Sequence, residues 1–117
     1  AAPLPSAEDK DLVARLDDLM TRERLFLDPD LTLSRLAKRM HVPIKHLSAA
    51  INRTKSQNVS RYVNDFRIRA ACEQLAQGET VTEAMFGSGF NTKSNFNREF
   101  LRVTGQTPTQ YTDAPKA

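Results

Sequence analysis

The sequence predicts an all-α fold in which two helix–turn–helix units are joined by a long linker helix. Apolar residues recur at helical spacing along most of the 117 residues, and the alternation typical of strands never persists. Capping residues and Pro or Gly breaks separate the helical segments. The segment Ile51–Tyr62 also matches the segment Phe100–Tyr111 at an offset of 49 residues, which indicates an internal repeat.

The first half of the chain is expected to contain one helix that is not part of the repeat, followed by the first helix–turn–helix unit. Ser6 can cap the first helix, and Thr32 is a plausible cap for a short second helix. Pro43 is expected as the first residue of a third helix over about 44–53, because its fixed φ suits that position. His41 would make the turn between them, since His is one of the few non-Gly residues that reach the left-handed region.

The second half repeats this arrangement. A linker helix is expected over about 60–77, with Gly78 as its natural stop, and Gly89 would make the turn of the second unit. The candidate caps of the last two helices are Thr80 or Thr82, and Asn91 or Thr92. Three apolar residues of the last helix are expected to face inward, namely Phe96, Phe100 and Val103.

These segments give an expected domain organisation. The beginning "AAPLPS" has neither an initiator Met nor a signal pattern, so we interpret the chain as a piece of a longer protein that is not secreted. The expected segments are a flexible lead-in (1–6), one helical domain (7–111) and a flexible tail (112–117). Within the domain they are the first helix–turn–helix (about 31–58), the linker helix (about 60–77) and the second helix–turn–helix (about 80–111).

Charge patterning indicates the kind of partner. The formal net charge is +3, but the segment from Leu31 to Asn64 contains seven Lys or Arg residues and no acidic residue. Such a one-signed segment is typical of a polyanion partner, whereas a merely solvated surface intersperses both signs. Residues 1–30 instead carry four basic and eight acidic side chains, which suits contact with another protein domain.

Other kinds of site lack their sequence pattern. One cysteine, Cys72, and two histidines provide no metal-ligand set, and no Gly-rich phosphate loop or nucleophile–base pair occurs in the sequence. We therefore expect no metal, no cofactor and no enzymatic activity. No apolar run approaches the roughly 20 residues that a membrane span needs, so we expect no membrane contact by this chain.

The second helix of each unit is expected to enter a DNA major groove while the first helix braces it. Asn can form two hydrogen bonds with adenine and Arg can do so with guanine, each discriminating by roughly 1–3 kcal/mol. Solvation explains any single Asn or Ser equally well, but a merely solvated helix rarely uses so many indifferent helix formers. The candidate base-reading residues are Lys45, Ser48, Ala49 and Asn52 in the first unit, and Lys93, Ser94, Asn95, Asn97 and Arg98 in the second.

Four further basic residues near helix ends are expected to contact phosphates and to add affinity that depends on salt. They are Arg53, Lys55, Arg61 and Arg102. Two recognition helices carried by one linker helix are expected to enter successive major grooves, about 34 Å apart. We expect the second unit to discriminate better, because it has Arg98 where the first has Ala49.

A helical protein-interaction module is the alternative hypothesis, in which the acidic first helix and the apolar faces would bind a partner. The basic repeat would then have no use. RNA binding is less favoured, because the Phe residues fall on apolar stripes rather than on exposed stacking surfaces.

The stretch "GSGFNTKSNFNREFLRVTGQTPTQY" resembles the C-terminal DNA-binding domain of the AraC/XylS family of bacterial transcription regulators, and the likeness covers about Leu31 to Tyr111. The resemblance implies about seven helices and sequence-specific binding to double-stranded promoter DNA. It also implies activation through contact with RNA polymerase, in the cytoplasm at the bacterial nucleoid. We expect the chain alone to be monomeric. Met85 and Gly87 depart from the family pattern, the latter where a helix-favouring residue is usual, a change worth about 1 kcal/mol in a helix interior.

Overall fold

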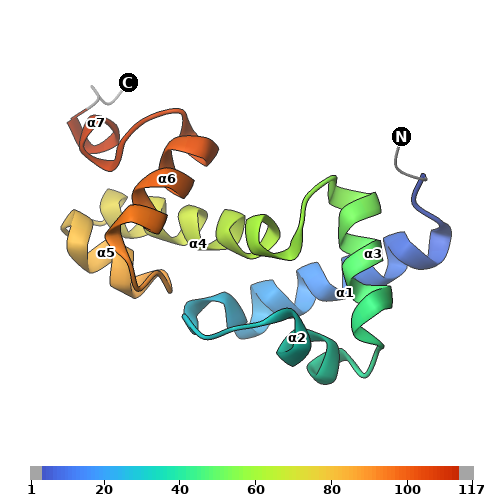
Figure 1. Ribbon diagram of the computed structural model, residues 1–117. Coiled ribbons are helices and arrows are strands. Elements are labelled where there is room, and N and C mark those ends of the chain that lie inside the picture. Colours follow the sequence, from blue (N-terminus) through green and yellow to red (C-terminus); the bar gives the residue numbers. More distant parts are fainter. Residues whose placement is uncertain (1–3, 114–117) are drawn as a thin grey trace. The chain divides into compact units, whose positions relative to one another are not determined.

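The structure is a computed structural model that describes residues 4–113, and this part of the chain contains seven α-helices and no strand (Figure 1). The predicted all-α fold is therefore confirmed. The elements are α1 (Ala7–Glu23), the 3₁₀ turn η1 (Leu25–Leu27), α2 (Leu33–Met40), α3 (Ile44–Lys55), α4 (Val59–Ala76), α5 (Val81–Gly87), α6 (Lys93–Thr104) and α7 (Pro108–Asp113).

The expected lead-in and tail are described only in part. Residues 1–3 and 114–117 lie outside the described residues. Ser6 caps α1, and α7 extends to Asp113, which is inside the segment expected to be a tail.

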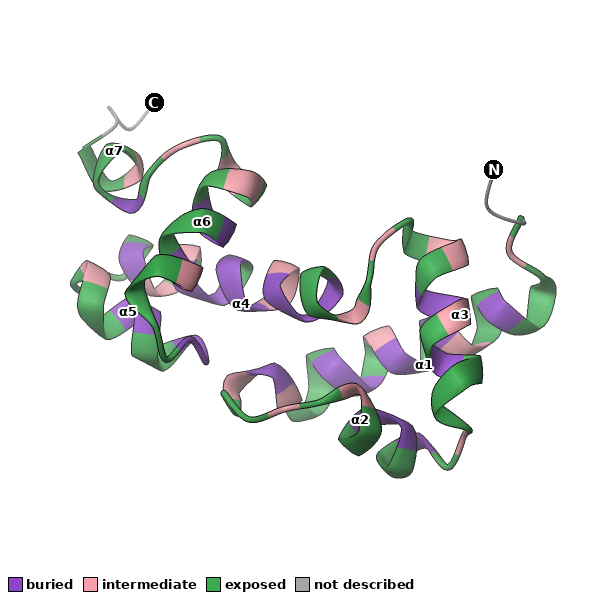
Figure 2. Ribbon diagram, viewed as in Figure 1, coloured by how far each residue is buried: buried purple, intermediate pink, exposed green. Residues whose placement is uncertain are grey.

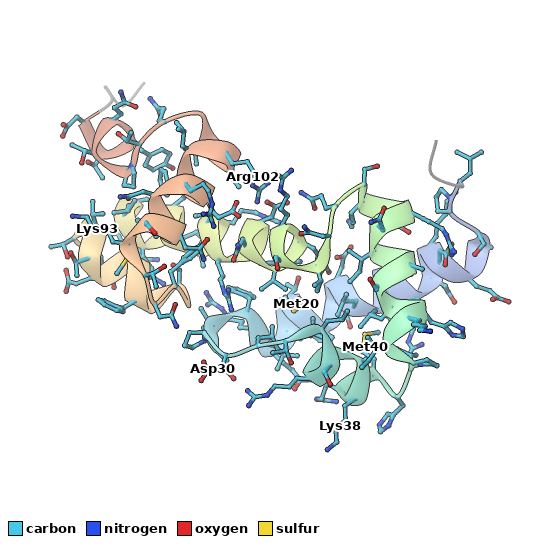
Figure 3. The ribbon with its side chains drawn as sticks, in the orientation of Figure 1. Met20, Asp30, Lys38, Met40, Lys93 and Arg102 are labelled. Atoms are coloured by element: carbon cyan, nitrogen blue, oxygen red, sulfur yellow. The ribbon has the colours of Figure 1, made fainter. Side chains whose placement is uncertain are left out.

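The chain divides into two compact units, Ala1–Val63 and Asn64–Ala117. Helix α4 begins in the first unit and continues into the second. In unit 1, α3 packs against both α1 and α2, and Met20 and Met40 lie among these helices (Figure 3). Helices α1, α2 and α3 each bury one stripe, and their other residues are exposed or partly buried (Figure 2).

Unit 2 is built around aromatic residues from three segments. Phe96 and Phe100 on α6 are fully buried. The rings of Phe90 and Phe96 lie 5.3 Å apart, and those of Phe100 and Tyr111 lie 5.4 Å apart, both edge to face. Met85 belongs to the same core. Helix α7 therefore completes the core of unit 2 by supplying Tyr111.

The prediction that Val103 faces inward was wrong. Its side chain is 37% exposed, because the group that turns inward in the last turn of α6 is the neighbouring Arg102, which contacts Glu99 and Asp65. The last turn of α6 is therefore held by polar contacts.

The predicted turns and caps are largely confirmed. His41 (φ 59°) and Gly89 (φ 101°) both adopt the left-handed conformation between the two helices of their units. Ser6, Thr32 and Thr80 accept hydrogen bonds from the first turns of α1, α2 and α5. Boundaries differ slightly: Pro43 lies one residue before α3 begins, α3 continues to Lys55, and the linker helix spans Val59–Ala76.

Asp9 joins two helices of unit 1 and gives the first testable prediction. Its carboxylate accepts a hydrogen bond of 3.0 Å from the backbone N–H of Ser6 and bonds of 3.2 and 3.3 Å from Arg53 on α3. The Ser6 hydrogen bond chiefly, with a contribution from Arg53, lowers the pKa of Asp9 below its ordinary value of 3.8, although burial opposes the shift.

We expect Asp9→Asn to lower the free energy of unfolding at pH 7. A lowered pKa contributes stability above the ordinary pKa, and this contribution is lost as the pH falls through the folded-state pKa. The difference between wild type and variant should therefore shrink below about pH 4. Urea unfolding at pH 7 and near pH 2.5 checks this, and an equal difference at both values would contradict it.

Gly87 and Gln74 give the second prediction. The Gln74 side chain on α4 donates from Nε2 to the Gly87 carbonyl oxygen at 3.0 Å, and a Cβ added to Gly87 would lie 2.3 Å from Gln74 Oε1. The amide thus fills the space that a helix-favouring side chain would need.

We expect Gly87→Ala to bring no gain in wild type, because it displaces the Gln74 amide. In a Gln74→Ala background the same change should raise the free energy of unfolding by about 0.5–1 kcal/mol, the usual advantage of Ala over Gly in a helix. Urea unfolding of the four proteins measures the coupling, and equal effects in both backgrounds would show that the two residues act independently.

Candidate nucleic-acid interface

Helix α3 is the predicted recognition helix of unit 1, and its inward stripe fixes which residues face solvent. Leu47 and Ile51 are fully buried. The four predicted base-reading residues of this helix lie on its outer side, where Lys45, Ser48 and Asn52 are exposed and Ala49 is partly buried. All four line one shallow groove on that side.

The recognition helix of unit 2 is α6, and it follows the same plan. Phe96 and Phe100 fill its inward stripe. Its predicted base-reading residues all avoid that stripe: Lys93, Ser94, Asn97 and Arg98 are exposed, and Asn95 is partly buried. Lys93 projects outward from the first turn of α6 (Figure 3).

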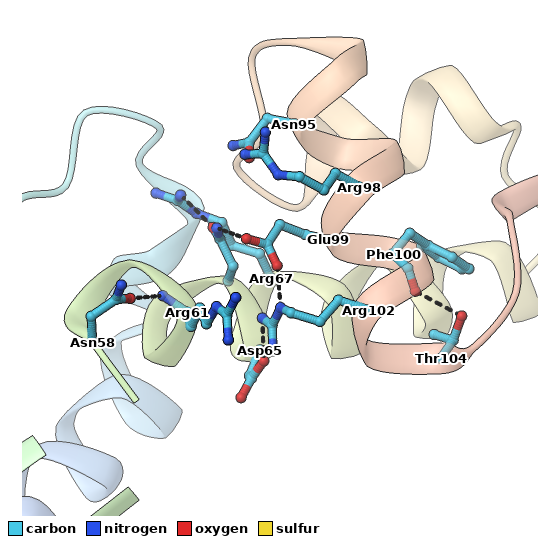
Figure 4. Close-up of polar contacts among 11 residues, drawn as sticks. Asn58, Arg61, Asp65, Arg67, Asn95, Arg98, Glu99, Phe100, Arg102 and Thr104 are labelled. Carbon is cyan, nitrogen blue, oxygen red and sulfur yellow. Dashed lines mark hydrogen bonds and ion pairs between the residues drawn. The ribbon is translucent and has the colours of Figure 1, made fainter. Parts of the chain in front are cut away.

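Two of these residues are bonded to each other. Arg98 Nη2 donates to Asn95 Oδ1 at 2.6 Å (Figure 4). The bond directs the long Arg98 side chain along the outer face of α6. The side-chain oxygen of Asn95 is therefore already hydrogen-bonded within the protein. The sequence prediction did not include this contact, although the spacing of three residues on a helix could have indicated it.

A polar network fastens α6 to α4 behind that face (Figure 4). Arg102 forms ion pairs with Glu99 through Nε and with Asp65 through Nη2, the latter at 2.7 Å. Glu99 also accepts from Asn64 Nδ2 at 3.3 Å, and Asn64 accepts from Arg67 at 3.1 Å. Because Glu99 is buried, loss of its partner would leave a costly unpaired charge.

Unit 1 has comparable contacts at the end of its recognition helix. Arg53 pairs with Asp9 at 3.2 Å and Lys55 pairs with Asp17 at 3.1 Å, so both basic residues join α3 to α1. Of the residues predicted to contact phosphate, Arg53, Lys55 and Arg102 therefore have carboxylate partners within the protein. The fourth, Arg61, lies in the first turn of α4, and its backbone N–H donates to Asn58.

The acidic N-terminal segment supplies partners to the basic helices of unit 1. Besides those two pairs, Arg39 pairs with Glu23, and Arg35 pairs with Asp28 at 3.3 Å. Much of the acidic character of residues 1–30 is thus used within unit 1. Within residues 4–113, the ion pairs found do not include Lys38 or Lys45, and Lys38 projects away from α2 (Figure 3).

Further features of the described residues concern metal ligation, the reactivity of a thiol and membrane-spanning helices. Residues 4–113 contain no group of three His, Cys, Asp or Glu side chains placed to hold a metal ion. Cys72 is half-buried, and burial raises the pKa of its thiol. Among the described helices, none combines the length and the apolar character needed to cross a membrane.

The sequence is similar to known regulators. Residues 36–114 match a family model described as a helix-turn-helix domain. An uncharacterized HTH-type transcriptional regulator of Staphylococcus aureus (strain MSSA476) is 32% identical over 88 residues, which cover 74% of this chain and 12% of the relative. A regulator of the same description in strain COL matches equally well over the same share of both chains. The chain thus spans about 12% of the length of these curated relatives.

Solved structures share the fold. The C-terminal domain of AraT, a response regulator from Geobacillus stearothermophilus, gives a TM-score of 0.77 at 23% identity over 91% of this chain and 87% of that domain. A Listeria innocua protein of unknown function gives 0.74 at 24% identity over 86% and 93%. The family match covers more than half of the chain and agrees with the two helix–turn–helix units described above. The chain belongs to the AraC-type helix-turn-helix family of DNA-binding transcription regulators.

Proposed function

We propose that this domain binds double-stranded DNA sequence-specifically by placing α3 and α6 in successive major grooves of one duplex. The observation that carries the proposal is the division of α6 into a buried aromatic stripe and an exposed stripe of hydrogen-bonding side chains. A fixed helix with directional donors and acceptors on its free side is the arrangement that reads base edges.

The base-reading residues proposed on α6 are Lys93, Ser94, Asn97 and Arg98, with Asn95 acting mainly by orienting Arg98. Those proposed on α3 are Lys45, Ser48, Ala49 and Asn52. The fork of Arg98 suits the two acceptors of guanine, and the amides suit adenine.

The residues proposed to contact phosphate differ in how strongly they are held by carboxylates within the protein. Lys55 and its partner Asp17 are both more than one-third exposed, so their ion pair is weak and is easily given up to a phosphate. We propose Lys55 and Arg61 as phosphate contacts. Arg53 and Arg102 have less exposed carboxylate partners, so we propose that they first hold the recognition helices and contact phosphate only in addition.

The biological setting follows from family membership. We propose a non-enzymatic activator domain that works at promoters in the bacterial cytoplasm and contacts RNA polymerase. We further propose that the domain alone is monomeric, since two different recognition helices in one chain can occupy two grooves without a second copy.

The test is selection of bound duplexes from a random library, followed by titration of selected and scrambled duplexes at several salt concentrations. We expect affinity to fall with salt for both duplexes and the selected one to bind at least a thousandfold more tightly. Equal affinity for the selected and the scrambled duplex would contradict the proposal of sequence-specific binding.

Replacement of Arg98 and replacement of Lys55 should have different kinds of effect on binding to the selected duplex. Arg98→Ala should remove about 1–3 kcal/mol of discrimination at one base pair, because it deletes a base-reading group. Lys55→Ala should weaken all sequences alike and reduce the slope of log affinity against log salt by about 0.9. Titration against duplexes mutated one base pair at a time separates the two effects, and identical profiles would show that the division of roles is wrong.

Asn95→Ala should reduce discrimination at the same base pair as Arg98→Ala, because Asn95 orients the Arg98 guanidinium. In an Arg98→Ala background the additional change should then have little effect at that position. Val103→Ala, an exposed position of α6 outside the proposed base-reading residues, serves as the control. Loss of discrimination at a different base pair would indicate that Asn95 reads a base of its own.

A further inference from the structure

The two recognition helices have the same length and register but differ at most outward positions, and the differences run both ways: Lys45 and Asn52 of α3 match Ser94 and Leu101 of α6. Helix α3 spans Ile44–Lys55 and α6 spans Lys93–Thr104, so equivalent residues lie 49 apart. At this offset the buried pairs coincide, with Leu47 matching Phe96. Two cationic groups of α6, Lys93 and Arg98, are replaced on α3 by Ile44 and Ala49.

Both replacements lie at the surface of unit 1. Ile44 is 47% exposed. Together with Ala49 and the partly buried Leu33 it lines a groove of about 450 Å³, whose remaining lining residues are Lys45, Ser48, Asn52 and Arg53. The outer face of α3 therefore combines apolar surface with one or two cations.

The charge around this groove limits what can occupy it. The segment from Leu31 to Asn64 has seven basic residues and no acidic one, and four of the seven pair with carboxylates of residues 1–30. Lys45, which is in none of the ion pairs found within residues 4–113, lies within the groove lining itself. A polyanion suits this field, whereas an ordinary apolar protein surface makes no use of it. A polyanion that also presents apolar groups is a DNA major groove, where each thymine displays a C5 methyl.

We infer that unit 1 recognises its half-site through thymine methyl groups, which contact Ile44 and Ala49, while unit 2 reads hydrogen-bonding edges. This inference rests on the proposed function and specifies its substrate: a site with thymine at one or two positions facing α3. Lys45, Ser48 and Asn52 flank the apolar pair and supply polar contacts beside the methyl groups.

Replacement of thymine by deoxyuridine tests the inference, because uracil keeps the hydrogen-bonding edge and lacks only the methyl group. In the selected duplex, each thymine is replaced in turn and affinity is measured by fluorescence anisotropy. We expect one or two replacements to weaken binding about fourfold each, the worth of one buried methyl group. Less than a twofold change at every thymine, with selective binding intact, would overturn the inference and leave the proposed function standing.

Two variants locate the contact on the protein. Ile44→Ala should abolish the deoxyuridine effect at one thymine, and the matched control Val103→Ala, an exposed aliphatic residue on α6, should leave every effect unchanged. Ala49→Arg recreates the residue at the equivalent position of α6, and selection with this variant should replace a thymine of the half-site by guanine.

Two outcomes would count against thymine readout. If Ile44→Ala preserves all deoxyuridine effects, the methyl groups are contacted by other residues. If the wild-type chain dimerises in sedimentation experiments and Ile44→Ala prevents this, the groove is an interface between copies of the chain. Failure to select any duplex at all would instead contradict the proposed function itself.

Discussion

Burial of one apolar stripe on each recognition helix is the constraint on which the interface depends. Leu47 and Ile51 on α3, and Phe96 and Phe100 on α6, are completely buried. Each such side chain stabilises the fold by roughly 1.5–3 kcal/mol, and together they fix the rotation of the helix about its axis. A helix free to rotate would present a mixture of faces. The inward residues therefore decide which residues face outward, and the proposed base reading depends on core packing.

Charge acts as a second constraint at the end of each recognition helix. Arg53 and Arg102 are equivalent in the repeat, and each is paired with a carboxylate on the helix that precedes its helix–turn–helix, Asp9 on α1 and Asp65 on α4. The basic field seen in the sequence is thus partly neutralised inside unit 1 by acidic residues of the N-terminal segment. This weakens the hypothesis that the acidic helix serves a protein partner, because several of its carboxylates already have partners.

Local features of the fold were predictable, and tertiary ones were not. Helical periodicity, the Ser6 and Thr32 caps and the left-handed turn at His41 depend on neighbouring residues and were read correctly. The residues proposed to read bases lie on the outward faces, because periodicity identifies both the buried stripe of a helix and the face opposite to it. The ion pairs of Arg53 and Arg102 join residues 44 and 37 positions apart, and no local pattern encodes such distances. The glycine at position 87 could not be explained from the local sequence either, because the space that a side chain would need is filled by the Gln74 amide of another helix.

The repeat also explains why two similar units need not contribute equally. A bidentate contact from Arg to guanine is directional and fails when the donor or acceptor is misplaced, so it discriminates by roughly 1–3 kcal/mol. A methyl contact is worth about 0.8 kcal/mol and tolerates small displacements. With Arg98 on α6 and Ala49 at the equivalent place on α3, we expect hydrogen-bond discrimination to come chiefly from unit 2. Unit 1 then contributes affinity, orientation and a weaker preference, so base changes under α6 should disturb binding more than those under α3.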